Sequence, residues 1–344
     1  MGRTVLVTGA ADALGSRFVA RLRRDPAVGR LIAVDRRPPV RRLPGVEFLS
    51  TDVRRPTLVS VLAERAVDTV VHLDVREAPL TQGEGRAAVK ENNVLGTMQL
   101  LGACQKVRGL RRLVVRSSTQ VYGSPAREPA VFDEDSPPRA PAGGGFARDV
   151  AEVEGYVRGF ARRRPEVAVT VLRFAHLLGP GSDSRLAAYF RLPVLPTVFG
   201  YDPRLQLVHE DDALEVLAEA AGDRGLGPGG AGVFNVAGDG VLTLAQAARR
   251  LGRPMVPVPS PLTPWLGSVL RTLGISGVSA EQFRSLLAGR VVRTGLLREA
   301  RGGPLPHTTA ETFADFVAVH GGGPLAPERL SWVVDRIEEV VRRG

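Results

Sequence analysis

Short runs of apolar and β-branched residues alternate along this chain with longer segments whose apolar residues recur every three to four positions. The short runs predict buried strands at residues 4–8, 31–35, 46–50, 68–73, 113–115 and 167–173. The intervening periodic segments predict helices, of which the longest covers residues 86–107. Because strands and helices alternate without hairpin signals, the pattern predicts an α/β fold with a doubly wound parallel sheet, whose ligand lies at the carboxyl ends of the strands.

The first strand leads through Thr8 and Gly9 into a helical segment with Leu14, Phe18 and Leu22 at four-residue spacing. The first N–H groups of a helix have no partners inside it, and they lie at the positive end of its dipole. A strand, tight turn and helix in this order therefore predict a site for a phosphate or pyrophosphate group.

Asp35 ends the second predicted strand, about twenty residues beyond the glycine turn. A carboxylate there can accept hydrogen bonds from the ribose hydroxyls of an adenosine, which favours NAD. Arg36 and Arg37 follow at once and would suit the 2′-phosphate of NADP, although Asp35 would repel that group. The pair Asp52 and Val53, after the third predicted strand, is placed to meet the adenine edge.

Composition limits the classes of protein that the chain can represent. Its 344 residues are 44% apolar, enough to bury a large core. Cys104 is the only cysteine, so no internal disulfide forms and a reducing compartment is expected. No leader pattern precedes the first strand and no apolar run is long enough to cross a bilayer, so we expect a cytoplasmic protein without a membrane span.

The formal net charge is +10, and residues 1–60 hold twelve arginines against five acidic residues. Such an excess raises the question of nucleic-acid binding. No basic motif interleaved with aromatic residues accompanies it, so we interpret the charge as a solvated basic face.

Further motifs follow in a fixed order along the chain. They are Asp68–Leu73 with its Val70-Val71-His72-Leu73 ending, Asn93–Thr97, Ser117–Gly123, Leu172-Arg173, Gly179–Gly181, Val208–Ala213 and Phe234–Gly238. Together with Thr8–Gly15, Asp35 and Asp52-Val53, this ordered set resembles the extended short-chain dehydrogenase/reductases of the NAD-dependent epimerase/dehydratase family, and the UDP-glucose 4-epimerase-like members most. The likeness runs from about residue 4 to residue 250 and continues more weakly to Phe316.

The resemblance implies a Rossmann-type domain over residues 1–175, with strands returning near 206–236, and a smaller substrate and helical region over 176–344. It also implies NAD as cofactor, a nucleotide sugar as ligand and a homodimer formed through the helices 86–107 and 146–163. The cofactor contacts that it assigns are Thr8, Gly9, Asp12, Ala13, Leu14, Gly15, Asp35, Arg36, Asp52, Val53 and Leu73.

Two departures from the family pattern affect this cofactor site. The family turn is Thr-Gly-x-x-Gly-x-x-Gly, and Asp12 replaces its middle glycine. Asp74 and Val75 stand where the family has small residues. Both carboxylates repel a pyrophosphate unless nearby arginines compensate, so we expect weakened binding.

The catalytic pattern departs further. The family uses a Ser or Thr four residues before the Tyr of Val-Tyr-Gly, which is Ser118 here, and a Tyr-x-x-x-Lys pair on the next helix. Four-residue spacing puts both side chains of that pair on one helix face, where lysine lowers the tyrosine pKa for proton exchange. In this chain the two positions hold Phe146 and Val150, and no lysine lies between Gly123 and Val171.

Two histidines are candidates for other chemistry. His176 stands where many sugar-nucleotide epimerases carry an Asn, and it is our candidate for a substituted proton-transfer group, with a structural hydrogen bond as the alternative. His209 precedes Glu210, Asp211 and Asp212, which we interpret as a helix start and not as a metal site.

Near the carboxyl end, Leu262–Leu273 and Ser331–Arg343 have amphipathic patterns. We interpret the first as a helix packed on the core, with a lid over an apolar substrate or a surface-binding helix as the alternatives. The sequence as a whole supports two hypotheses: a nucleotide-sugar enzyme with an impaired proton-transfer step, or a non-catalytic protein that binds a dinucleotide or nucleotide sugar.

Overall fold

The computed structural model describes residues 2–39, 44–55, 57–77, 84–123, 131–138, 145–258 and 289–323. The helices expected over Leu262–Leu273 and Ser331–Arg343 lie outside these residues. None of the helices in the described ranges is long and apolar enough to cross a membrane.

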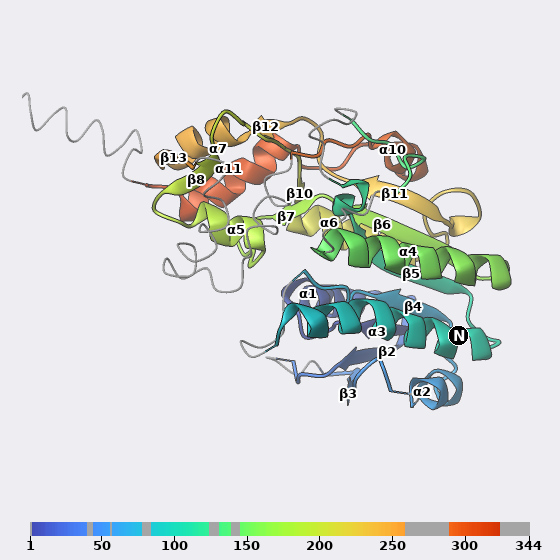
Figure 1. Ribbon diagram of the computed structural model, residues 1–344. Coiled ribbons are helices and arrows are strands. Elements are labelled where there is room, and N and C mark those ends of the chain that lie inside the picture. The colour runs from blue at the N-terminus through green and yellow to red at the C-terminus, as the bar shows by residue number, and fades with distance from the viewer. Residues whose placement is uncertain are drawn as a thin grey trace, which may run out of the picture.

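A seven-stranded sheet forms the centre of the molecule, and all its strands are parallel (Figure 1). Its order is β11-β6-β5-β4-β1-β2-β3, with bounds Gly232–Val236, Ala168–Phe174, Arg112–Ser118, Thr69–His72, Arg3–Thr8, Val28–Asp35 and Val46–Ser50. All residues of β4 are buried, as expected of an inner strand covered on both faces. The predicted doubly wound parallel sheet is thus confirmed.

Helices cover both faces of this sheet. On one face lie α2 (Leu58–Glu64), α3 (Arg86–Lys106) and α4 (Gly145–Arg163), which share an apolar core with strand residues such as Leu6 and Val70. On the other face lie α1 (Ala13–Leu22) and α6 (Glu210–Ala221), packed on Val5 and Val71. Alternate residues of each strand thus enter opposite cores.

The strands β2 and β5 are longer than their apolar runs. β2 begins at Val28, three residues before the apolar run that starts at Leu31. The apolar pattern contains no sign of this extension because Gly29 and Arg30 are not apolar, although the backbone there already pairs with β1. β5 extends to Ser118, where Ser118 pairs with Phe174 of β6. The extension carries Arg116 and Ser118 to the sheet edge where a ligand site is expected.

Beyond β6 the chain builds a second, smaller set of elements. They are β7 (His176–Leu178), α5 (Arg185–Phe190), β8 (Leu195–Val198), β9 (Arg204–Leu205), β10 (Leu207–His209), β12 (Leu242–Thr243), α7 (Leu244–Leu251), β13 (Met255–Val258), α10 (Gly295–Arg301) and α11 (Thr309–His320), with short 3-10 turns η1 (Thr119–Tyr122) and η2 (Pro228–Gly230). The strands pair as β10 with β7, β12 with β9 and β13 with β8. Phe190 packs edge-on against Phe313, with ring centroids 5.2 Å apart, in an apolar core of their own.

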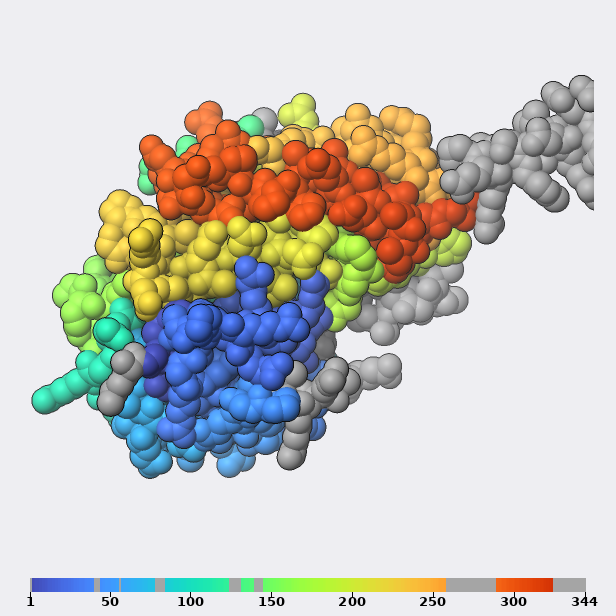
Figure 2. All heavy atoms as spheres, turned by 180° about the vertical axis from the view of Figure 1, so that it is seen from behind, coloured from blue at the N-terminus to red at the C-terminus, as the bar shows by residue number. Residues whose placement is uncertain are grey.

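Seen from the opposite side, α6 lies between the amino-terminal segments and the carboxyl-terminal helices (Figure 2). Arg17 on α1 pairs with Asp211 at 2.6 Å, and Arg301 on α10 pairs with Glu215 at 2.6 Å. The helix therefore joins the central sheet to the later elements by ion pairs as well as by packing.

A series of buried hydrogen bonds connects β1, β4 and α3. Thr97 Oγ1 donates to the carbonyl of Asn93, so it accepts from Nε2 of His72 at 2.9 Å. The other ring nitrogen, Nδ1, is therefore unprotonated and accepts from Thr8 Oγ1 at 2.7 Å. Burial, helped by the charge of Arg76, lowers the pKa of His72 to about 3.

This histidine makes stability depend on pH. Because the folded pKa of His72 is below the unfolded value, the unfolded chain takes up the proton first, and the stabilisation present above about pH 6.5 is lost as pH falls toward 3. We expect His72 to account for about 2 kcal/mol of the free energy of unfolding lost between pH 7 and pH 5. Urea unfolding at both pH values measures this, and the variant His72→Gln should show a correspondingly smaller loss. An unchanged loss in the variant would contradict the assignment.

Candidate functional site

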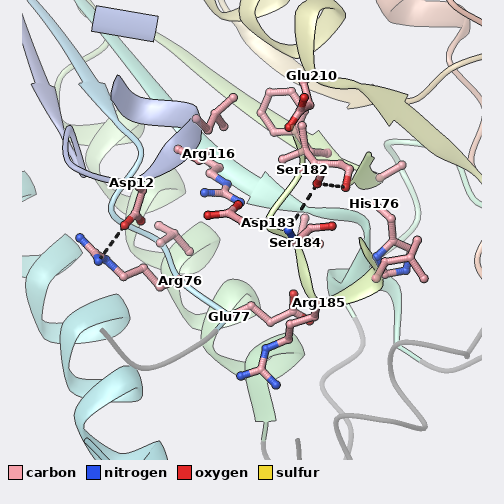
Figure 3. A pocket seen from close by; sticks show the side chains of 18 of the residues that line it. Asp12, Arg76, Glu77, Arg116, His176, Ser182, Asp183, Ser184, Arg185 and Glu210 are labelled. Atoms are coloured by element: carbon pink, nitrogen blue, oxygen red, sulfur yellow. Dashed lines mark hydrogen bonds and ion pairs between the residues drawn. The ribbon is translucent and has the colours of Figure 1, made fainter. Parts of the chain in front are cut away.

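A cavity of about 350 Å³ lies at the carboxyl ends of β1, β4, β5 and β6 (Figure 3). It extends from the glycine turn to Ser118 and Phe146, so one space joins the predicted cofactor turn to the predicted catalytic positions. Its charged lining residues are Asp12, Arg17, Arg37, Arg76, Glu77, Arg116, Asp183, Arg185 and Glu210.

The glycine turn has the close backbone approach that a phosphate cradle needs. Gly9 has a φ of +71°, and a Cβ on Gly15 would lie 2.0 Å from the carbonyl oxygen of Gly9. Ala13 and Leu14, the first residues of α1, line the cavity. The side chain of Asp12, at the N-cap, makes no cap hydrogen bond, so it leaves the helix N–H groups available to a ligand. This part of the site fits a dinucleotide diphosphate.

Arginines compensate the carboxylate of Asp12. Arg37 Nη2 lies 2.7 Å from Asp12 Oδ1, and Arg76 Nη1 lies 3.2 Å from the same oxygen. The repulsion expected from Asp12 is therefore offset by two guanidinium groups that belong to the chain itself.

The other predicted cofactor residues do not line the cavity. The Asp35 side chain is fully buried, and its two oxygens accept from the backbone N–H groups of Ala11 at 3.1 Å and Arg37 at 3.0 Å. Leu73 and Val53 are buried in the two cores, and Asp52 is bound by Arg54. Arg36 lies 3.4 Å from Glu84, while Thr8 is held by His72.

Ser118 and Phe146 both line the cavity, as their positions in the motif predict. Ser118 Oγ accepts the N–H of Gln120 at 3.2 Å, which leaves its own proton free to donate. Val150, one turn after Phe146 on α4, is buried in the apolar core. A group that titrates is thus missing at both helix positions.

No tyrosine or lysine takes their place. All four tyrosines and both lysines of the chain lie in the described ranges, and none lines the cavity. Tyr122 is buried, with its hydroxyl donating to Asn235 Oδ1 at 2.7 Å and accepting from Arg173 Nη1 at 2.7 Å. Tyr189 donates to the carbonyl of Pro196.

His176 lines the same cavity. Burial, opposed by Glu77 and reinforced by Arg290, lowers the pKa of His176 to about 4. The ring is therefore neutral at pH 7 and takes up a proton weakly, which suits a hydrogen-bonding role better than general base catalysis.

Four arginines of the cavity were given no role from the sequence, namely Arg17, Arg76, Arg116 and Arg185. Arg76 joins Asp12 to the buried carboxylates behind the turn. Arg116, at the end of β5, reaches into the cavity (Figure 3) and makes no hydrogen bond or ion pair with another described residue, although Asp12 and Glu77 act on it at longer range. Burial lowers the pKa of Arg116. An arginine directly after a predicted buried strand, where a ligand site is expected, is the sequence signal that could have identified it.

His209 is the N-cap residue of α6, which begins at Glu210, so the expected helix start is confirmed. Its Nδ1 accepts the N–H of Asp211 at 3.1 Å, and Glu210 pairs with Arg17 at 2.9 Å. A neutral ring therefore bears its proton on Nε2, which lies 3.7 Å from Asp315 Oδ2, while the ring stacks on that of His307. Although ligand atoms of these three residues lie within 4.8 Å of one another, this tautomer cannot offer Nε2 to a metal.

Comparison of the sequence with known proteins identifies a matching family and similar chains. The sequence model of the NAD dependent epimerase/dehydratase family matches residues 5–237. An uncharacterized protein of Mycobacterium tuberculosis, Rv0501, is 44% identical over 336 residues, which are 96% of this chain and 88% of that protein. UDP-glucose 4-epimerase 3 of Oryza sativa subsp. japonica is 30% identical over 233 residues, 61% of this chain and 60% of that protein.

Solved structures with a similar fold cover nearly the whole chain. MoeE5 in complex with UDP-glucose and NAD superposes with a TM-score of 0.68 at 25% identity, covering 92% of this chain and 98% of that one. The UDP-glucose 4-epimerase of Thermotoga maritima with UDP-glucose has a TM-score of 0.70 at 17% identity, with the same coverage.

Proposed function

This chain belongs to the NAD-dependent epimerase/dehydratase family, and we propose from that premise that it binds NAD and a nucleotide sugar but lacks the ordinary tyrosine and lysine proton transfer. The observation that carries the proposal is the pair Phe146 and Val150 on α4, with neither a tyrosine nor a lysine in the described lining of the cavity. A positioned general acid or base contributes about a hundred- to ten-thousand-fold in rate, so its loss leaves the reaction slow or absent.

The backbone of Thr8–Gly15 would hold the diphosphate of NAD, and Asp35 would meet the adenosine ribose. When bound, NAD supplies a centre that accepts and returns hydride. Ser118 would donate a hydrogen bond to a substrate hydroxyl, and neutral His176 would accept one. These residues can bind and orient a sugar, but none of them is a strong base at pH 7.

A nucleotide sugar suits the charge of the cavity. Arg17, Arg116 and Arg185 line the cavity, and guanidinium groups bind diphosphates well. MoeE5, at 25% identity, was solved with UDP-glucose and NAD in one complex. We therefore propose a sugar nucleotide as the ligand and NAD, not NADP, as the cofactor.

The assembly and location belong to the same proposal. Leu95 and Met98 on α3 and Tyr156 on α4 are exposed large side chains on two helices that pack side by side, and they support a homodimer through these helices. The single, buried Cys104 agrees with a cytoplasmic protein.

One experiment distinguishes an enzyme with an impaired proton-transfer step from the second hypothesis, a binding protein without turnover. Purified protein is incubated with UDP-glucose and millimolar NAD, and conversion to UDP-galactose is followed by NMR. We expect binding of both ligands with conversion at most a hundredth of a Tyr/Lys family enzyme's rate, and any residual conversion should be lost in Ser118→Ala. Conversion at a full family rate would contradict the proposal, and residual conversion unaffected by His176→Ala would remove that histidine from proton transfer.

A further inference from the structure

Arg76 spans three carboxylates at the head of the cofactor turn. Its Nη1 lies 3.2 Å from Asp12 Oδ1, its Nη2 lies 3.1 Å from Asp35 Oδ2, and its Nε binds Asp74 Oδ1. Each nitrogen of the guanidinium thus contacts a different acid. The Arg76, Asp35 and Asp74 side chains are 6%, 0% and 3% exposed, so most of the cluster is shielded from solvent.

The hydrogen bonds of this cluster occupy the carboxylate oxygens of Asp35 that a ribose would use as acceptors. Asp35 Oδ2 accepts from Arg76 and from the N–H of Ala11, and Oδ1 accepts from the N–H of Arg37. A ribose diol at the end of β2 has to donate to this same carboxylate. The guanidinium of Arg76 therefore competes with the ribose hydroxyls for Asp35 Oδ2.

We propose that Arg76 occupies the adenosine-ribose subsite of the cofactor groove and has to leave Asp35 before a dinucleotide binds. The inference rests on the proposed dinucleotide function, because it concerns the same site. It makes Arg76 the residue that sets cofactor affinity, and it assigns to wild-type protein a weaker affinity for any ligand that contains the adenosine ribose.

The surroundings explain why the guanidinium stays in place. Burial alone would lower the pKa of Arg76, but Asp74, Asp12 and Asp35 together raise it above the ordinary arginine value. Burial raises the pKa of Asp74, and Arg76 opposes that rise. Asn92 Nδ2 donates to Asp74 Oδ1 at 3.2 Å and to the Asp74 carbonyl at 3.1 Å, which fixes the acid that anchors Arg76.

The test is the double substitution Asp74→Ala/Arg76→Leu, which removes one acid and one base and so leaves the formal charge of the cluster unchanged. NAD and ADP-ribose are titrated calorimetrically into wild-type and variant protein. We expect the variant to bind both at least tenfold more tightly, because Asp35 becomes available to the ribose. Nicotinamide mononucleotide, which lacks the adenosine ribose, should bind the two proteins within about twofold of each other.

A matched control separates this effect from charge and from unfolding. Arg37→Ala removes an arginine that also pairs with Asp12 but whose side chain does not reach Asp35, and its backbone N–H still donates to that acid. We expect no gain in NAD affinity from Arg37→Ala. Thermal unfolding and circular dichroism establish that both variants are folded before binding is compared. In the folded double variant, millimolar guanidinium chloride should weaken NAD binding more than the same concentration of sodium chloride.

The outcomes distinguish the inference from the function on which it rests. Equal, measurable NAD affinities of wild-type and double variant would overturn the inference and leave the dinucleotide function standing. An NAD complex of the wild-type protein in which Arg76 remains on Asp35 would do the same. If neither protein binds NAD or ADP-ribose, the inference and the proposed function fail together.

Discussion

The double variant Phe146→Tyr/Val150→Lys is expected to convert UDP-glucose at least about a hundredfold faster than the wild-type chain, within the range of a hundred- to ten-thousand-fold that a positioned acid/base supplies. Both positions lie on α4, one turn apart, and Phe146 already lines the cavity beside Ser118. A tyrosine at residue 146 supplies a hydroxyl that can titrate, and a lysine at residue 150 lowers the pKa of that hydroxyl.

The measurement is conversion followed by NMR, at NAD concentrations above the dissociation constant of each protein. Val150 is fully buried, so the new lysine has to extend its amine toward the cavity, and thermal unfolding shows how much stability this costs. Each single variant serves as a control, and neither should reach the rate of the pair. A folded double variant that binds NAD and stays inactive would show that the substrate side of the cavity does not suit this sugar.

Replacing Glu154 by alanine is expected to lower the free energy of unfolding by about 3–5 kcal/mol. The carboxylate accepts from Arg173 Nε at 2.9 Å, from Arg173 Nη2 at 2.7 Å and from Ser117 Oγ at 2.6 Å. Glu154 and Arg173 side chains are 2% and 3% exposed. Removing the acid leaves a buried guanidinium without its counter-charge, and removing one partner of such a pair is costly.

Glu152, two residues earlier on α4, provides the matched control. It pairs with Arg148 at 3.2 Å and with Lys90 at 3.5 Å near the surface, and Glu152→Ala should cost no more than about 1 kcal/mol. Urea unfolding of both variants at pH 7 measures the difference. Similar losses at the two positions would contradict the assignment of a buried, essential pair at Glu154.

The sheet was predictable because its inner strands are continuous apolar runs that stand out in the sequence. The family resemblance likewise implied that Ser118 and Phe146 belong to one site, and both line the cavity. What the pattern could not supply was the extent of strands whose ends are polar, such as Val28–Arg30, since backbone pairing continues there without an apolar signal.

The site itself was predicted only in part. Asp35 stands at the end of β2 as its distance from the glycine turn indicated, but the partner that binds it, Arg76, lies 41 positions further along the chain. Nothing in the local pattern around Arg76 specifies the direction of a long, flexible side chain. Only the folded arrangement of three strand ends shows which acid that arginine meets.

The last strand added to the sheet, β11, has a consequence for fragments of this protein. It comes from residues 232–236, after the chain has already built β7 to β10, and it pairs with β6 from Thr170 to Phe174. A fragment that ends before Gly232 would leave the N–H and C=O groups of β6 open along one border, and such a border recruits strands from neighbouring copies. Truncation near residue 175, where the predicted Rossmann-type domain ends, should thus yield a polymerising, insoluble product. A shortened version that stays dispersed needs residues up to Val236.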